Sequence, residues 1–405
     1  MINRIYVLLL IIITLICSCD DGNPLIDNEK LLLDTYGELK DDTLYAFADT
    51  FIIGDPVVTG FSPKLLVGAY RDFQARSLLK FAGFPNDTMR LDSVQILISS
   101  IGAFGEKTSL VEATIYKIVE EWDNSVNTDE AWQDYMSKVN PQSVAKTSFN
   151  AVVQDTTEFI FDLPVNLVSE WQDTTSGDKN FGILIDYSNA DFILECASRE
   201  NSEILKAPRI VYIYTDIAQD TTIRDTVLTL QDASLISYTG TFDQNKIFVS
   251  SGYTTYAFFK FDFSVLPTNI NISSVDFFFS RDTLSSIINP YRIQAVILRN
   301  SVTDYSLLPY YEIDSTFVSS VFYNVILTEE TAKRLSLDNS IKAGIGQTFI
   351  QSIINKSIQN GSFYLEYSGK GNDISVYAIR GIHDADINAR PQLKIQYYDV
   401  PKGRL

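Results

Sequence analysis

The sequence repeats itself once, and this repeat sets the domain count. Four pairs of segments match in the same order along the chain: Asp42–Thr50 with Asp225–Ala233, Lys80-Phe81 with Lys260-Phe261, Asp92–Val94 with Ser273–Val275, and Ala207–Tyr214 with Arg390–Tyr397. Their spacing stays between 180 and 183 positions in a chain of 405 residues. Solenoid repeats recur every 20–50 residues or so, and a period this long therefore indicates two tandem domains.

Each copy contains the same strand-like stretch, Arg76–Ser99 in the first and Tyr256–Ser280 in the second. Both have an apolar segment, a turn that contains proline and a second apolar segment. Apolar side chains alternate in the manner of half-buried strands at Leu79, Phe81, Val94, Ile96 and Ile98, and at Phe259, Phe261, Val275, Phe277 and Phe279. We predict that this stretch forms the core hairpin of each domain.

Helical patterns are scarce, and only Leu163–Trp171 and Gln347–Asn355 suit short helices. The 25 Phe and 22 Tyr residues favour pleated strands. We therefore predict an all-β chain of two tandem antiparallel β-sandwich (jelly-roll-like) domains that follow a lipoprotein signal peptide. The expected boundaries are a signal peptide at 1–18, an acidic tether at 19–41, a first sandwich at 42–215, a linker at 216–224 and a second sandwich at 225–400.

The N-terminus has the features of an exported lipoprotein. Arg4 precedes the apolar run Ile5–Ile16, which is shorter than the roughly 20 residues of a membrane-spanning helix. The following Ile16-Cys17-Ser18-Cys19 resembles a bacterial lipobox, in which Cys19 is diacylated, for example with palmitate, and becomes the new N-terminus. A plain secretory signal with an accidental cysteine is the alternative.

Asp20-Asp21, which follows the lipidated cysteine, is compatible with two cellular locations. An Asp at this place resembles an inner-membrane retention signal of enterobacteria, whereas an acidic cluster resembles a surface-export signal of Bacteroidota. The Ile, Asn, Lys and Tyr content favours the second. We expect the outer membrane or the cell surface, with the periplasm-facing leaflet of the inner or outer membrane as the alternative.

The order of short motifs resembles a DNRLRE-type domain. In the first copy these motifs are Ala48–Ile52, Leu78–Phe81, Leu91–Val94, Val119–Trp122, Val165–Trp171, Phe181–Leu184 and Ala207-Pro208, and in the second they are Phe259–Pro267 and Arg390-Pro391. The resemblance covers about residues 42–215 and 225–398, although the DNRLRE string itself is absent. It implies a carbohydrate-binding-module-like sandwich, an accessory or surface module without catalysis.

A glycan-binding face needs exposed aromatic side chains on which sugar rings can stack. Trp132 and Trp122 flank an acidic loop-like segment, and Tyr310 and Tyr311 lie in similarly polar surroundings. These four are the predicted ligand-binding residues, together with the weaker candidates Trp171 and Tyr323. The alternative is packing in the sandwich core for Trp122 and Trp171 and packing on a strand face for the tyrosines, whereas Trp132 is the least core-like of the set.

We predict no cofactor, and a structural calcium ion is only a fold-level alternative. Its candidate ligands are Asp216, Asp220 and Asp225, or Asp373, Asp384 and Asp386. Catalytic motifs are absent from the sequence, and a histidine-dependent site would depend entirely on His383. Cys196 lies in an apolar run and is expected to be a buried hydrophobe.

The sequence therefore predicts a non-catalytic, membrane-anchored envelope lipoprotein. Glycan binding or adhesion is the first hypothesis, and structural or assembly contacts with envelope proteins are the second. A glycan hydrolase that uses two carboxylates is the third, because an acidic chain offers many such pairs. The net charge of −19 argues against nucleic acid as a partner.

Overall fold

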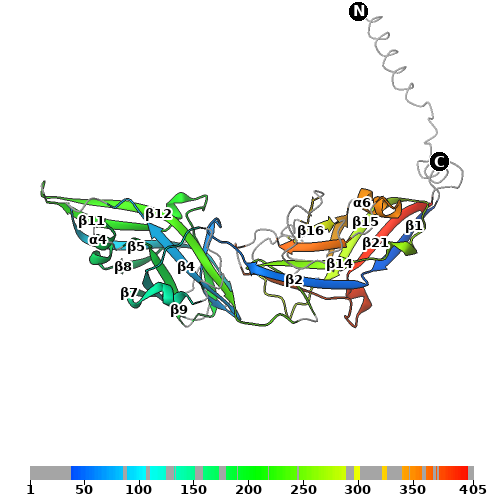
Figure 1. Cartoon of the computed structure of the whole chain (residues 1–405), viewed down its shortest axis with the longest axis horizontal. Coiled ribbons are helices and arrows are strands. Elements are labelled where there is room, and N and C mark those ends of the chain that lie inside the picture. Colours follow the sequence, from blue (N-terminus) through cyan, green and yellow to red (C-terminus); the bar gives the residue numbers. More distant parts are fainter. Residues whose placement is uncertain are drawn as a thin grey trace, which may run out of the picture.

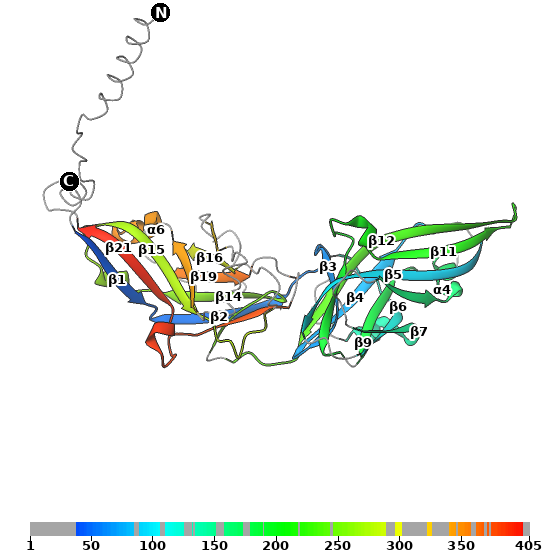
Figure 2. The same cartoon turned by 180° about the vertical axis from the view of Figure 1, so that it is seen from behind.

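The computed structural model describes residues 38–84, 89–105, 110–124, 132, 134–150, 158–172, 179–188, 190–217, 219–243, 246–288, 296–301, 322–325, 340–345, 347–357, 362–367, 371 and 374–399. These residues form an elongated body of two all-β lobes that lie side by side (Figure 1). Strand β1 lies at one end of the body, and the turn between β11 and β12 lies at the other (Figures 1 and 2).

The first sandwich is a connected set of antiparallel strands. They are β3 (Lys64–Tyr70), β4 (Phe73–Phe81), β5 (Met89–Gly105), β6 (Leu110–Ile118), β7 (Val139–Asn150), β8 (Glu158–Leu163), β9 (Ile183–Ser188), β10 (Phe192–Ala197), β11 (Arg209–Asp216) and β12 (Thr221–Tyr238). Helix α4 (Val165–Gln172) packs its apolar side against this core, and short 3-10 turns lie at Tyr135–Lys138 and Ile204–Lys206.

The second sandwich has the sheet orders β1-β21-β15-β18 and β17-β16-β19-β14-β2, with a separate β13-β20 pair. Its elements are β1 (Leu39–Tyr45), β2 (Ala48–Pro56), β13 (Ile247–Ser250), β14 (Tyr253–Lys260), β15 (Ile270–Ser280), β16 (Val296–Ser301), β17 (Phe322–Val325), β18 (Ser340–Ile345), α6 (Gln347–Ile354), β19 (Ser362–Tyr367), β20 (Val376–Ile379) and β21 (Gln392–Asp399). Two 3-10 turns, Phe263–Val265 and Ile387–Ala389, complete the set.

The predicted fold class is confirmed. Both copies are all-β and sandwich-like, and the two predicted helices are present as α4 and α6. The alternating faces are also confirmed, because Val94, Ile96 and Ile98 are buried in one core. Their counterparts Val275, Phe277 and Phe279 are buried in the other.

The predicted core hairpin is wrong in both copies. Strand β4 pairs with β3, β9 and β12, whereas β5 pairs with β8, β10 and β11, so β4 and β5 share no ladder. In the second copy β14 and β15 belong to different sheets. Phe259 and Phe277 meet across the core at a ring distance of 5.4 Å. Each stretch is an arch whose two strands face each other, because alternation fixes the buried face of a strand but not its neighbour.

The first strand of each sequence copy lies in the sandwich built by the rest of the other copy. Strands β1 and β2 pair with β21 and β14 of the second sandwich. Strand β12, at the start of the second copy, pairs with β11 and β4 of the first sandwich. The sequence copies and the sheets therefore have different boundaries. We call this arrangement the strand exchange.

A shared apolar cluster joins the two sandwiches. Leu66, Phe73 and Ile236 of the first pack in one cluster with Phe248 and Val376 of the second. Aromatic rings continue across this junction, because the ring of Phe73 on β4 lies 6.5 Å from the ring of Tyr253 on β14. Burial of such a cluster resists separation of the two lobes.

The two exchanged segments also bond directly to each other. Thr59, which follows β2, donates its hydroxyl to the carbonyl of Ser234 on β12 at 2.6 Å. The same hydroxyl accepts the backbone N–H of Ser234 at 2.7 Å. Nearby, the backbone N–H of Tyr238 donates to the hydroxyl of Tyr253 at 2.8 Å. The two exchanged segments therefore contact each other at the junction between the sandwiches.

Candidate functional site

The exchanged strands occupy equivalent slots in the two sandwiches. Asp225 lies opposite Tyr212 in the β11–β12 ladder, and Asp42 lies opposite Ile395 in the β1–β21 ladder. Asp42 and Asp225 are 183 positions apart in the sequence, and so are their partners Tyr212 and Ile395. Both aspartates also accept a tyrosine hydroxyl from the last strand, at 3.2 Å for Asp225 and at 2.8 Å for Asp42 from Tyr397. The slots therefore match in register and in chemistry.

Each exchanged strand carries an aspartate that accepts a hydrogen bond from a loop of its host sandwich. The two loops are equivalent, because one follows β10 and the other follows β20. The carboxylate of Asp49 accepts the backbone N–H of Ile382 at 2.6 Å. The carboxylate of Asp232 accepts the backbone N–H of Arg199 at 2.7 Å. Asp49 and Asp232 are 183 positions apart, as are Arg199 and Ile382. We call these two contacts the aspartate clasps, and they fix each exchanged strand to its host.

The residue next to each clasp differs, and this changes the acidity of the aspartate. The pKa of Asp232 is raised to about 7, chiefly by burial and also by the adjacent Glu200, while the Arg199 N–H lowers it. Burial also raises the pKa of Asp49, while the Ile382 N–H and the neighbouring His383 lower it. Glu200 and His383 stand at equivalent positions, 183 apart. The neighbour of the clasp thus raises the pKa of the aspartate in the first sandwich and lowers it in the second.

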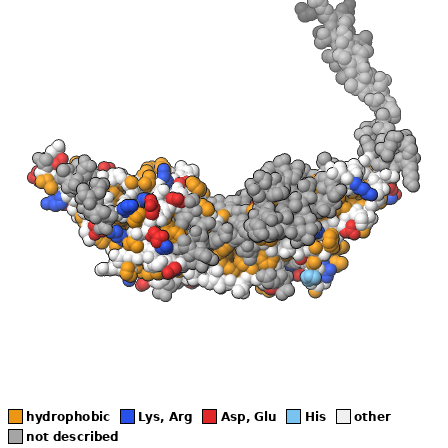
Figure 3. Space-filling view, viewed as in Figure 1, with side chains coloured by type: hydrophobic (Ala, Val, Ile, Leu, Met, Phe, Trp, Pro, Cys, Tyr) orange, Lys and Arg blue, Asp and Glu red, His pale blue; other side chains and the backbone are white. Residues whose placement is uncertain are grey.

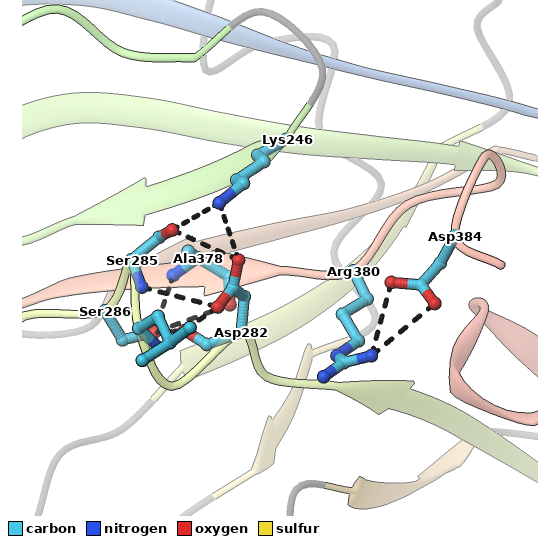
Figure 4. Close-up of polar contacts among 8 residues, drawn as sticks. Lys246, Asp282, Ser285, Ser286, Ala378, Arg380 and Asp384 are labelled. Atoms are coloured by element: carbon cyan, nitrogen blue, oxygen red, sulfur yellow. Dashed lines mark hydrogen bonds and ion pairs between the residues drawn. The ribbon is translucent and has the colours of Figure 1, made fainter. Parts of the chain in front are cut away.

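The loop that receives Asp49 is held by ion pairs and turns (Figure 4). Arg380 and Asp384 form an ion pair at 3.4 Å across this loop. On the other side of β20, Asp282 binds Lys246 at 2.7 Å and accepts the hydroxyl of Ser285 at 3.1 Å. These charges satisfy one another, so they serve to position the loop and do not point to an open catalytic centre.

Each exchanged strand presents an open edge. Among the described residues, β1 lies at the end of its sheet and pairs with β21 alone. Thr221–Leu228 of β12 pair only with β11, because β4 joins β12 from Thr229 onward. Most side chains along these edges are exposed. Open edges offer unpaired backbone groups to another strand.

Apolar side chains extend outward beside the β12 edge. In the sheet, Leu228 lies opposite Arg209, Arg209 opposite Leu97, and Leu97 opposite Ile160. Leu228 and Ile160 are exposed, and Leu205, whose carbonyl accepts a bond from Arg209, is 83 % exposed. Exposed leucine and isoleucine side chains near an open strand edge are suited to contacts with another protein.

Two of the predicted ligand-binding residues are buried. Trp122 and Trp132 are 5 % and 7 % exposed in an apolar cluster with Leu78 and Leu184. The indole N–H of Trp122 donates to the carbonyl of Phe181 at 2.7 Å. A buried indole cannot present its face to a sugar ring. Trp171 is also buried, at 9 %, so the three tryptophans form no glycan platform.

Other predicted residues have different outcomes. Cys19, Tyr310 and Tyr311, as well as the calcium candidate Asp373, lie outside the described residues. Cys196 is buried as expected, and burial raises the pKa of its thiol to about 12. In the described part of the chain, no three acidic, histidine or cysteine side chains gather to hold a metal ion.

His383 lies exposed on the surface of the second sandwich, where it is the pale blue side chain of Figure 3. Its position beside Asp49 gives it a role in the clasp.

Within the described ranges, none of the helices has the length and apolar character needed to cross a bilayer.

Comparisons with known proteins add no family. No family model and no curated protein matches the sequence. Among solved structures, a chain from the Macrobrachium rosenbergii nodavirus structure has 8 % identity and a TM-score of 0.13, with 90 % of each chain covered. A TM-score this low carries no argument about this chain. The DNRLRE-type resemblance therefore stays a prediction.

Proposed function

We propose that this chain is a non-catalytic lipoprotein of the bacterial envelope, anchored through Cys19 at the outer membrane or cell surface. Its fused pair of sandwiches acts as a structural module that makes protein–protein contacts. The observation that carries the proposal is the pair of open sheet edges, β1 and Thr221–Leu228, at opposite ends of one joined body.

The chemistry of the described surface favours protein contacts over the other two hypotheses. The tryptophans that would stack on glycans are buried, which leaves Tyr310 and Tyr311 as the candidates for that role. A hydrolase needs two carboxylates across a cleft. The buried carboxylate of Asp232, only 1 % exposed, instead accepts the backbone N–H of Arg199 and holds the strand exchange. Open edges and exposed leucines are direct means of binding another protein.

Photocrosslinking in intact cells tests the role of the edges. A photoreactive residue at Thr43 on β1 or at Thr226 on β12 should give discrete adducts with envelope proteins. The same probe at the exposed Glu121 should give none, because Glu121 follows β6, which is next to neither β1 nor β12 in the sheet order. Edges that yield no protein adduct, in a chain that binds purified surface polysaccharide, would replace this proposal with the glycan hypothesis.

A second experiment tests the anchor. Replacing the lipidated side chain by Cys19→Ala should move the protein from the membrane fraction to the soluble fraction. Cys196→Ala is the matched control and should leave the protein in the membrane, since Cys196 is buried in the core. Retention of the Cys19→Ala variant in the membrane would contradict anchoring through this residue.

A further inference from the structure

The two open edges are equivalent strands of the repeat, and they carry opposite charges at one matched position. Asp41 on β1 and Arg224 on β12 are 183 positions apart and occupy the same place in their ladders. Both side chains are exposed, and neither forms an ion pair with the residues that the structure describes. Edge strands that carry charge resist random pairing, but opposite charges select a partner.

One antiparallel register between β1 and the β12 edge places these charges together. When Asp41 lies opposite Arg224, Lys40 lies opposite Asp225 and Thr43 lies opposite Thr222. Residues directly opposite in an antiparallel pair share a face of the sheet, and opposite charges there stabilise the pair. This register also keeps the outward faces of both sheets on the same side, because it joins equivalent positions of the two strands.

The other face-preserving registers lack this complementarity. A shift of two residues in one direction places Asp42 opposite Asp225, and a shift in the other leaves Arg224 opposite Leu39. Two β12 edges centred on the same position would bring Arg224 against Arg224, and two β1 edges would bring Asp41 against Asp41. Like charges directly opposite destabilise a strand pair. The charges therefore favour pairing between unlike edges.

We propose that copies of this chain associate head to tail, with β1 of one copy paired antiparallel to Thr221–Leu228 of the next. This inference rests on the proposed function and names a second copy as the partner of each edge. The two edges lie at opposite ends of the elongated body (Figures 1 and 2). Because the contact joins two different surfaces, each added copy leaves one edge of each kind open, and the assembly grows as a chain until a rotation closes it into a ring.

Sedimentation of the full-length chain in mild detergent tests the pairing. The wild type should form a concentration-dependent series of oligomers that salt weakens, since the paired charges are exposed. Asp41→Arg alone and Arg224→Glu alone should each weaken association about tenfold or more, because each places like charges opposite one another. The control Glu121→Arg should associate like the wild type.

Charge exchange separates a specific pairing from simple loss of folding. The double variant Asp41→Arg with Arg224→Glu should regain association, and an equimolar mixture of the two single variants should do the same. A wild type that stays monomeric at all concentrations, or a double variant that does not recover, would overturn the head-to-tail pairing. Edge adducts with other envelope proteins would then still support the proposed function, so the two failures are distinguishable.

Discussion

The two sandwiches share one strand-pairing pattern but obtain their first strand in different ways. In the first, β12 follows β11 after a short turn, so the slot is filled by a local hairpin. In the second, β1 reaches its slot from the other end of the chain, and the bond between Asp42 and Tyr397 spans 355 positions. A local contact forms at little entropic cost, whereas a distant one requires most of the chain to be in place. The second sandwich thus depends more than the first on a strand that is distant in the sequence.

The sandwiches also differ in how their sheets are connected. In the first, the β3–β10 pair is hydrogen-bonded to β4 and β5, so the strands form one continuous set. In the second, the equivalent β13–β20 pair is a separate two-stranded sheet, joined to Arg281 and Ile287 by isolated bridges. Within the described strands, the second sandwich therefore has fewer internal ladders to compensate for loss of its exchanged strands.

Deletion of residues 38–56 should have the largest effect. It removes β1 and β2 from the second sandwich and leaves every strand of the first in place. We expect the second sandwich to unfold, a loss comparable to the whole stability of a typical domain, about 5 kcal/mol or more. Hydrogen exchange should show rapid exchange of β14 and β21 amides, with β4 and β11 still protected.

A peptide of residues 38–56 added to this deletion should restore protection of β14 and β21, because it supplies the missing strands in trans. Deletion of residues 20–37 is the matched control and should leave both sandwiches protected. If β14 and β21 stay protected without β1 and β2, the second sandwich does not depend on the strand exchange.

Matched core substitutions should separate the two sandwiches more finely. Leu44 and Val227 are 183 positions apart on the exchanged strands, and both are buried. Leu44→Ala should cost about 3 kcal/mol and Val227→Ala about 2 kcal/mol, because each leaves a cavity. Hydrogen exchange should localise the first loss to β14 and β21 and the second to β11 and β4. Losses that appear in the opposite sandwich would contradict the strand exchange.

The sequence predicted the faces of strands but not their partners. Alternation at Val94, Ile96 and Ile98 correctly identified a buried face, because burial is a property of each strand alone. Asp42–Thr50 and Asp225–Ala233 are so similar that either could fit either slot, and nothing local decides between them. The position of Trp122 and Trp132 beside an acidic segment was equally misleading, since side chains next to a polar loop can still point into the core.

One signal for the clasps, although not for the strand exchange, was present in the sequence. Asp49 and Asp232 repeat at 183 positions, and so do the loop residues that bind them, although these are as different as Arg199 and Ile382. The clasps use backbone N–H groups of the loop. Loop side chains were therefore free to diverge, and only the aspartates kept the pattern visible.

The clasps should give the two sandwiches different pH dependence. Asp232 has a folded pKa of about 7, whereas an unfolded Asp titrates near 4. Between these values the folded state binds the extra proton, so the free energy of unfolding should fall as pH rises from about 4 to 7 and level off above. Asp232→Asn should remove most of this pH dependence, about 3 kcal/mol between pH 5 and pH 8, and should be more stable than the wild type at pH 8.

Asp49→Asn is the control for this titration. The pKa of Asp49 is raised by burial but lowered by Ile382 and His383, so its substitution should change the slope less. Denaturant unfolding of both variants at pH 5 and pH 8 measures the difference. An unchanged slope in Asp232→Asn would show that the proton is held elsewhere.

The smallest loss of stability should come from substitution of the loop residue next to each clasp, Gly381 or Ser198. A Cβ at Gly381 would lie 2.6 Å from the carboxylate of Asp49, closer than side-chain carbons approach an oxygen. The equivalent Ser198 already carries a side chain, and its hydroxyl donates to the carbonyl of Ser62 at 2.6 Å. Gly381→Ala should therefore displace Asp49 and cost about 1–2 kcal/mol, while Ser198→Ala should cost about 1 kcal/mol for the lost bond.

The double variant Gly381→Ala with Asp49→Asn distinguishes displacement of the clasp from a general packing defect. If Gly381→Ala acts by pushing Asp49 away from the N–H of Ile382, it should add little once that charged hydrogen bond has been weakened by Asp49→Asn. Ser198→Ala and Asp232→Asn should instead show nearly additive losses at pH 5, since Ser198 binds Ser62 and not Asp232. Full additivity in the Gly381 pair would mean that the glycine is needed for the path of the loop itself and that the clasp tolerates a side chain in both sandwiches.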